Sequence, residues 1–165
     1  MQNITKFEKV SYEQYNRDLL KNNIKDVDSY ENIKLPKRAT KGSAGYDFYT
    51  PFDIELKPND TISIPTGIRC KMNENYVLMI FPRSSLGFKY RLNLDNTVGI
   101  IDSDYYNALN EGHIMIKVTN NSLDNKTLIL QKGDAFAQGI FVTYGITCDD
   151  ETNEIRVGGF GSTNK

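Results

Sequence analysis

The feature that most constrains the fold is a series of short β-prone runs that fills the chain after Leu35. Turn residues, such as those of Pro65-Thr66-Gly67, separate the runs about every eight to twelve residues. This spacing predicts an all-β fold, either a jelly-roll β-barrel or a related sandwich. The predicted strands span residues 54–57, 61–64, 68–71, 76–81, 113–119, 127–131 and 135–144.

One short N-terminal helix is predicted before this series, over residues 11–24. Ser11 is a suitable N-cap with Gln14 three residues later, and apolar residues then recur with a helical period. Residues 7–10 predict a short strand ahead of the helix, and the polar residues 25–34 predict a connection after it.

The chain of 165 residues has no internal repeat, low-complexity tract or inter-domain linker, which indicates one domain. We expect residues 1–34 to form a strand and helix that pack on the barrel, and residues 35–155 to form the barrel itself. Residues 156–165 are expected to form a flexible C-terminal arm.

The composition excludes several classes of function. A net charge of −1 provides no basic field to attract nucleic acid or an anionic membrane. The longest apolar run, 76–81, is far shorter than the roughly 20 residues of a membrane helix, and the N-terminus lacks the apolar segment of a signal peptide. Cys70 and Cys148 stand alone, which argues against a zinc site and a disulfide framework. A cytoplasmic location is the simplest expectation.

The single histidine, His113, limits the chemistry available. It lies in a segment that alternates like a strand, so we expect a plain strand position rather than a catalytic base. If the chain is an enzyme, its general base is therefore expected to be a carboxylate.

Several polar residues are more specific than turns require. Arg83, Ser84 and Ser85 follow the most apolar run, and a guanidinium beside two hydroxyls suits a phosphate. Asp47 is either a cap at the start of a strand or a carboxylate near a metal–phosphate group. Gln138 lies among small and apolar residues, where its amide needs partners.

A further group of candidates begins at Asn96, whose amide can both donate to and accept from a pyrimidine edge. Residues 98–101 are apolar and expected to be buried, which puts Asp102 at the mouth of an apolar pocket. Such a carboxylate suits a general base that orients water. Tyr105 supplies a flat ring beside it.

The C-terminal segment runs Arg156-Val157-Gly158-Gly159-Phe160-Gly161-Ser162-Thr163. Its guanidinium and hydroxyls could bind phosphate, and its aromatic ring could stack on a base. Taken alone, the segment fits a flap that orders over a nucleotide and an unstructured tail equally well.

In their order along the chain, the segments around Asp47, around Arg83, from Asn96 to Tyr105 and around Gln138, followed by the C-terminal segment, resemble the five motifs of the trimeric dUTPase family. The resemblance covers about residues 35–163. The resemblance implies a β jelly roll and a homotrimer whose active sites are shared between subunits. It also implies hydrolysis of dUTP to dUMP and pyrophosphate, with Mg²⁺ on the triphosphate.

The resemblance assigns roles residue by residue. Asp102 matches the carboxylate that orients the water attacking the α-phosphorus. Asn96, with the backbone at Ile100 and Ile101, matches the hairpin that reads uracil. Tyr105 matches the ring under the deoxyribose, where the 2′-hydroxyl of UTP would clash.

The remaining implied contacts involve the phosphates, the metal ion and the arm. Asp47 and Gln138 match residues that approach hydrated Mg²⁺ through water only. Phe160 matches the ring that stacks on uracil, and Arg156 matches the contact to the γ-phosphate. The other implied substrate-binding residues are Arg83, Ser84, Ser85, Met115, Gly161, Ser162 and Thr163.

The chain departs from the family pattern in three places. Residues 106–111 form an insertion before Gly112, which is expected to alter the sugar pocket or the surface between subunits. Ala135-Phe136 stands where Arg-Ile is common, so one cation is missing. Arg156 lies one residue closer to Phe160 than in many members.

Two alternatives stay open at this point. A dCTP deaminase-like enzyme shares the fold and a similar Arg-Ser-Ser segment, and Glu111 is its only nearby candidate for a catalytic glutamate. A regulatory binding protein on a dUTPase scaffold would use the N-terminal helix and the insertion as partner surfaces.

Overall fold

The computed structural model of the chain describes residues 5–25 and 28–158. The β-prone runs form strands close to their predicted bounds, apart from the first residues of the 113–119 run. These strands are β4 (Ile54–Leu56), β5 (Thr61–Pro65), β6 (Ile68–Met72), β7 (Tyr76–Pro82), β10 (Met115–Thr119), β11 (Leu128–Leu130) and β12 (Ala135–Thr143). The structure adds β1 (Thr5–Lys9), close to the predicted 7–10 strand, and β2 (Lys37–Arg38), β3 (Tyr46–Tyr49), β8 (Asn93–Leu94) and β9 (Gly99–Ile101).

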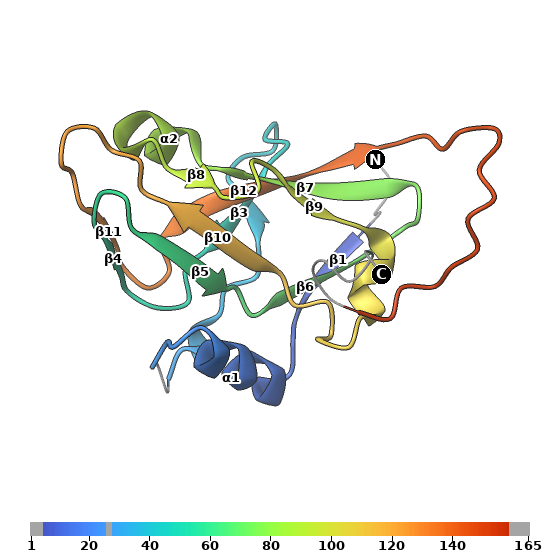
Figure 1. Cartoon of the computed structure of the whole chain (residues 1–165), viewed down its shortest axis with the longest axis horizontal. Coiled ribbons are helices and arrows are strands. Elements are labelled where there is room, and N and C mark those ends of the chain that lie inside the picture. Colours follow the sequence, from blue (N-terminus) through green and yellow to red (C-terminus); the bar gives the residue numbers. More distant parts are fainter. Residues whose placement is uncertain (1–4, 26–27, 159–165) are drawn as a thin grey trace.

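The strands pair antiparallel throughout the described chain. A five-stranded sheet has the order β2-β3-β12-β7-β9, and a three-stranded sheet has the order β5-β10-β8. The pairs β11-β4 and β1-β6 extend the barrel at its two ends, as Figure 1 shows. The all-β jelly-roll prediction is therefore confirmed.

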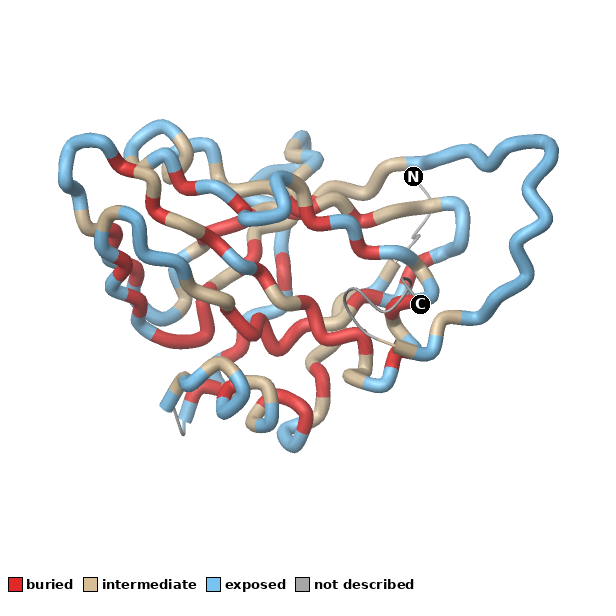
Figure 2. The backbone as a smooth tube through the Cα atoms, in the orientation of Figure 1, coloured by how far each residue is buried: buried red, intermediate tan, exposed pale blue. Residues whose placement is uncertain are grey.

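The core lies between the sheets and is built from alternate residues of each strand. In β10, Ile116 and Val118 are buried while Lys117 between them is exposed. Figure 2 shows buried residues running along the inner strands from one end of the barrel to the other. Strand periodicity in the sequence thus corresponds directly to the packed interior.

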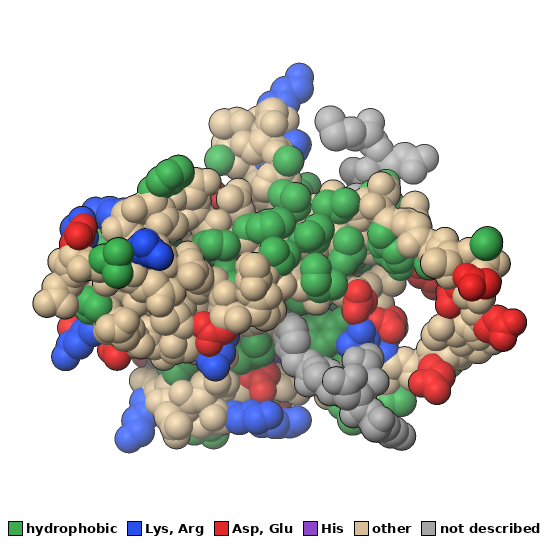
Figure 3. Space-filling model, turned by 45° about the horizontal axis from the view of Figure 1, so that its top comes forward, with side chains coloured by type: hydrophobic (Ala, Val, Ile, Leu, Met, Phe, Trp, Pro, Cys, Tyr) green, Lys and Arg blue, Asp and Glu red, His purple; other side chains and the backbone are tan. Residues whose placement is uncertain are grey.

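The outer face of the five-stranded sheet is also apolar. Met79 of β7 pairs with Ile100 on one side and Ile140 on the other, and Val77 pairs with Val142. These residues alternate with the buried ones, so they point away from the core. Hydrophobic side chains gather across this part of the surface in Figure 3. A sheet that is apolar on both faces is typically covered on each face by another layer of protein.

The predicted N-terminal helix is confirmed as α1 (Tyr12–Lys21), which packs below β5 and β6 in Figure 1. Ser11 caps it, because the Ser11 hydroxyl accepts a hydrogen bond from the Gln14 N–H at 3.1 Å. The helix ends earlier than residue 24 because the chain turns at Asn22 and Asn23, and Asn23 has a left-handed φ of 57°.

A second helix, α2 (Ser84–Tyr90), was not predicted from the sequence. Arg83 is its N-cap, and Arg91 ends it with a left-handed φ of 50°. The Arg-Ser-Ser segment was interpreted as a turn, since Pro82 follows the apolar strand and lacks the N–H that would continue its pairing. Two short 3-10 helices, η1 (Tyr30–Asn32) and η2 (Ser103–Asn107), complete the described elements.

His113 does not lie in a strand, which corrects that expectation. It precedes β10 and is fully buried, with Nε2 accepting a hydrogen bond from the Gly67 N–H at 2.8 Å. The proton of the neutral ring is therefore on Nδ1, which lies 2.5 Å from a carboxylate oxygen of Asp18 in α1. The alternation around His113 gave no sign of these distant partners.

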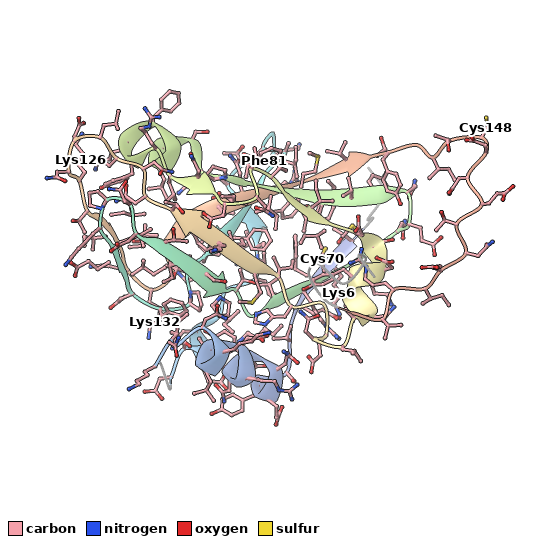
Figure 4. All side chains as sticks on the ribbon, in the orientation of Figure 1. Lys6, Cys70, Phe81, Lys126, Lys132 and Cys148 are labelled. Atoms are coloured by element: carbon pink, nitrogen blue, oxygen red, sulfur yellow. The ribbon has the colours of Figure 1, made fainter. Side chains whose placement is uncertain are left out.

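The two cysteines are both free. Cys70 is buried in β6, and burial raises the pKa of its thiol to about 12. Cys148 is exposed at the tip of the loop that follows β12, well away from Cys70 in Figure 4. Residues 144–158 contain neither helix nor strand. No helix in the described part of the chain is long and apolar enough to cross a membrane.

Candidate active site

A cavity of about 600 Å³ opens between β9 and β10. Three of its lining residues, Asn96, Ile101 and Met115, are predicted substrate-binding residues. Asp18 of α1 and Asn110 of the insertion also line it, and neither was predicted to be part of the site. The structure therefore brings Asn96 and Ile101, two candidate uracil-reading residues, together with α1 and with the insertion that was expected to alter the sugar pocket or the surface between subunits.

The turn that carries Asn96 is held by neighbouring strands. The Thr97 N–H donates to the Leu94 carbonyl at 3.0 Å, and Thr97 has a left-handed φ of 68°. The Asp95 carboxylate accepts a hydrogen bond from Thr119 and lies 3.1 Å from the Lys117 ammonium. These contacts lower the pKa of Asp95, the Thr119 hydrogen bond most of all, and the ionised carboxylate ties the turn to β10.

Asp102 follows β9 directly, and half of its side chain is exposed. Its carboxylate lies 2.6 Å from the Arg156 guanidinium, which also lies 2.8 Å from Asp104. The expectation that residues 98–101 are all buried is wrong, because β9 alternates: Ile101 is buried and Ile100 is exposed. The same alternation directs Asp102 away from the core, where water can reach it.

Tyr105 lies in η2, where its backbone N–H donates to the Asp102 carbonyl at 3.2 Å, and its ring is almost fully buried. Its hydroxyl donates to the His113 carbonyl at 2.8 Å and accepts from the Asn110 amide at 2.8 Å. The Arg156 guanidinium lies 5.9 Å from the ring centroid. The predicted flat ring is therefore held at its hydroxyl end by His113 and Asn110.

A second group of predicted residues meets where β3, β12 and the start of α2 come together. The Arg83 guanidinium lies 3.4 Å from the Asp47 carboxylate, and Gln138 pairs with Asp47 across the sheet. The Gln138 amide donates to the Pro82 carbonyl at 3.4 Å. Ser84 begins α2 immediately after Arg83. Carboxylate, amide and guanidinium groups here suit phosphates with a hydrated cation.

The two groups lie far apart within one chain. Leu78 pairs with Ile101, so Asp102 follows near the start of β7, whereas Arg83 follows its other end. At about 3.3 Å per residue, the intervening strand separates them by more than about 15 Å. A single chain thus holds the candidate base pocket and the candidate phosphate group at separate places.

Within the described residues, no group of three or more His, Cys, Asp or Glu side chains could hold a metal ion. Mg²⁺ favours oxygen ligands and keeps several waters, and it commonly binds through substrate phosphates. The Asp47 carboxylate and the Gln138 amide oxygen fit contacts made through such waters. Phe160, Gly161, Ser162 and Thr163 lie outside the described residues.

The family model described as dUTPase matches residues 31–164. A deoxyuridine 5'-triphosphate nucleotidohydrolase from Lactococcus lactis is 39% identical over 142 residues, which cover 83% of this chain and 93% of the relative. The enzyme of the same name from Paraburkholderia xenovorans is 38% identical over 154 residues, covering 88% and 99%.

Solved structures agree with these relatives. The crystal structure of dUTPase from Streptococcus mutans has a TM-score of 0.65 and 34% identity, covering 86% of this chain and 97% of that one. The dUTPase from phage phi11 of Staphylococcus aureus has a TM-score of 0.66 at 20% identity, covering 93% and 98%, which indicates a shared fold.

Proposed function

Because this chain belongs to the dUTPase family and is a dUTP diphosphatase that forms dUMP, we propose that Asp102 orients the attacking water. The observation that carries this assignment is the half-exposed Asp102 carboxylate at the end of β9, beside the cavity that Asn96 lines. A carboxylate there can accept the proton of a water aligned with the α-phosphorus.

Uracil would enter the cavity and meet Asn96, the backbone at Ile100 and Ile101, and Met115. An amide that both donates and accepts can pair with the edge of uracil. Tyr105 would lie under the deoxyribose and exclude the 2′-hydroxyl of UTP. Its burial and its fixed hydroxyl support a rigid ring in this role.

The triphosphate would be bound by Arg83 and by the Ser84 and Ser85 hydroxyls. Asp47 and Gln138 would contact a hydrated Mg²⁺ carried by the phosphates, and the cation would neutralise charge on the triphosphate. Neutralisation and alignment matter most in this chemistry, because the leaving group is a polyanion.

The arm would complete the site, with Phe160 stacked on uracil and Gly161, Ser162 and Thr163 near the phosphates. Arg156 would then contact the γ-phosphate, which requires it to leave Asp102 and Asp104. Release of Asp102 from this ion pair would accompany closure of the arm.

We further propose a homotrimer with shared active sites. The reaction needs Asp102 at the α-phosphorus and Arg83 on the same triphosphate, yet one chain separates them by more than about 15 Å. A second subunit can supply the missing group. The apolar outer face of β7 and β12 supports such an assembly, since it offers a surface for another subunit to cover.

Subunit mixing tests this arrangement. Asp102→Asn and Arg83→Ala homotrimers should each be nearly inactive. When the two variants are refolded together in equal amounts, about a quarter of all active sites should combine an intact Asp102 with an intact Arg83, and these sites should be active. Pyrophosphate release from dUTP is the measurement, with each variant refolded alone as the control. Absence of recovery in mixed trimers would argue that both groups act from one subunit.

A substrate panel tests the function itself. Pyrophosphate release with Mg²⁺ should be rapid from dUTP and slow from dCTP, dTTP and UTP. Ammonia released from dCTP would instead favour the deaminase alternative. The structure gives Glu111 another role, because its carboxylate accepts hydrogen bonds from the Ser11 N–H at 2.7 Å and the Ser11 hydroxyl at 2.6 Å. A regulatory role beside catalysis stays a hypothesis.

A further inference from the structure

The insertion 106–111 and the N-terminal segment hold each other in place. The Glu111 carboxylate accepts from the backbone and hydroxyl of Ser11, the N-cap of α1. Burial opposes ionisation of Glu111, but these hydrogen bonds outweigh it and lower its pKa. At the other end of the insertion, the Tyr106 hydroxyl donates to Glu8 at 2.5 Å, and the Arg69 guanidinium lies 4.2 Å from the Tyr106 ring.

The insertion also turns back sharply onto Tyr105. Glu111 and Gly112 both have left-handed φ values, of 58° and 68°. A Cβ at Gly112 would lie 2.6 Å from the Tyr105 carbonyl oxygen and 2.7 Å from the Tyr106 Cα, so only glycine fits there. This close return brings Asn110 and His113 to the Tyr105 hydroxyl.

The hydrogen bonds at the Tyr105 hydroxyl form a chain in which the donor and the acceptor of each bond are defined. The Gly112 N–H donates to the Asn110 side-chain oxygen at 3.3 Å, which turns the Asn110 amide N–H toward Tyr105. The Tyr105 hydroxyl then donates to the His113 carbonyl at 2.8 Å. Burial raises the pKa of Tyr105 to about 12, so the hydroxyl keeps its proton at any working pH.

The His113 end of this arrangement is anchored in α1. Its ring lies between the Gly67 N–H and the Asp18 carboxylate, and Asp18 also accepts from the Gln14 amide at 2.8 Å. Burial opposes ionisation of Asp18, but the hydrogen bonds from His113 and Gln14 outweigh it and lower its pKa. The His113 carbonyl therefore has little freedom to move away from Tyr105.

We propose that Asn110 is a positioning residue that sets the preference for dUTP over UTP by fixing the Tyr105 ring. The inference rests on the proposed role of Tyr105 under the deoxyribose. A ring that excludes a single hydroxyl must not shift, because a displacement of one bond length would admit it. Asn110 and the His113 carbonyl hold the Tyr105 hydroxyl from two directions, and the insertion and α1 brace both of them.

The test compares dUTP with UTP rather than measuring dUTP alone. In Asn110→Ala, the ratio of kcat/KM for dUTP to that for UTP should fall about five- to tenfold, as for one lost, partly buried hydrogen bond. Asn107→Ala is the matched control, because Asn107 is an exposed asparagine in the same insertion. It should leave the ratio unchanged. A purely structural role for Asn110 would reduce both substrates in equal proportion.

Tyr105→Phe keeps the ring but loses the hydrogen bonds to both Asn110 and the His113 carbonyl, so it should lower the ratio at least as much as Asn110→Ala. Adding Asn110→Ala to it should give no further decrease, because both changes break the same contact. An unchanged ratio in Asn110→Ala, or full additivity in the double variant, overturns the inference. If Asn110→Ala does not fold, Asn110→Asp decides the question, because it keeps the shape of the side chain and removes the N–H donor to the Tyr105 hydroxyl. If the wild-type protein and these variants all prefer dUTP over UTP to the same degree, the inference about Asn110 fails but the proposed function stands. If the wild-type protein releases no pyrophosphate from dUTP, the proposed function and the inference both fail.

Discussion

Replacing Asp102 with Asn should lower the turnover of dUTP at least about a hundredfold, with dUTP binding retained. The two side chains have nearly the same shape, so the end of β9 and the cavity beside it keep their structure. The amide cannot accept the proton of the attacking water, which removes general-base assistance. The Arg156 guanidinium stays paired with Asp104, so the substitution leaves no buried charge unpaired, and folding should be little affected.

Pyrophosphate release and calorimetric titration with dUTP separate the two effects in Asp102→Asn. Asp104→Asn is the matched control, because Arg156 lies against both carboxylates and either substitution weakens that contact. Asp104→Asn should therefore retain most of the turnover. Near-normal turnover in Asp102→Asn would remove this carboxylate from the mechanism, while equal losses in both variants would attribute the effect to Arg156.

The fold was predictable because most of its strands bury one residue in two. That period identified β7 and β10 within two residues of their observed bounds, and the Ser11 cap identified the start of α1. The helix α2 was missed because its seven residues have no continuous apolar stripe. The local pattern of apolar and polar residues says little about such a short helix, because its formation depends on packing against the strands around it.

The candidate site was predictable only in part. Asn96 and Met115 were predicted from the family resemblance and line one cavity, and the predicted Asp102 directly follows Ile101, which lines the same cavity. The contacts of Asn110 and Asp18 could not be predicted in this way. Each contact is set by the fold, since Asp18 meets a residue 95 positions away and Asn110 bonds to the hydroxyl of a buried tyrosine in η2.

Removal of residues 159–165 should lower kcat/KM for dUTP about ten- to a hundredfold. Stacking of an aromatic ring on a base contributes about 1–3 kcal/mol, and the deletion also removes the hydroxyls expected to meet the phosphates. The ligand-free protein should keep its melting temperature, because the buried apolar core lies between Val10 and Ala137. Steady-state pyrophosphate release and thermal unfolding are the measurements.

The choice of end point separates the arm's contacts with nucleotide from its contacts with the barrel. A chain that ends at Gly158 keeps Arg156 and the hydrogen bond from the Leu109 N–H to the Val157 carbonyl at 3.3 Å. A chain that ends at Ile155 loses both. Phe160→Ala in the full chain should reproduce most of the loss seen in the 159–165 deletion, because the ring supplies the stacking. If the shorter deletion hydrolysed dUTP at the full rate, closure of the arm over the nucleotide would have no part in catalysis, and Arg156 would act only as the partner of Asp102.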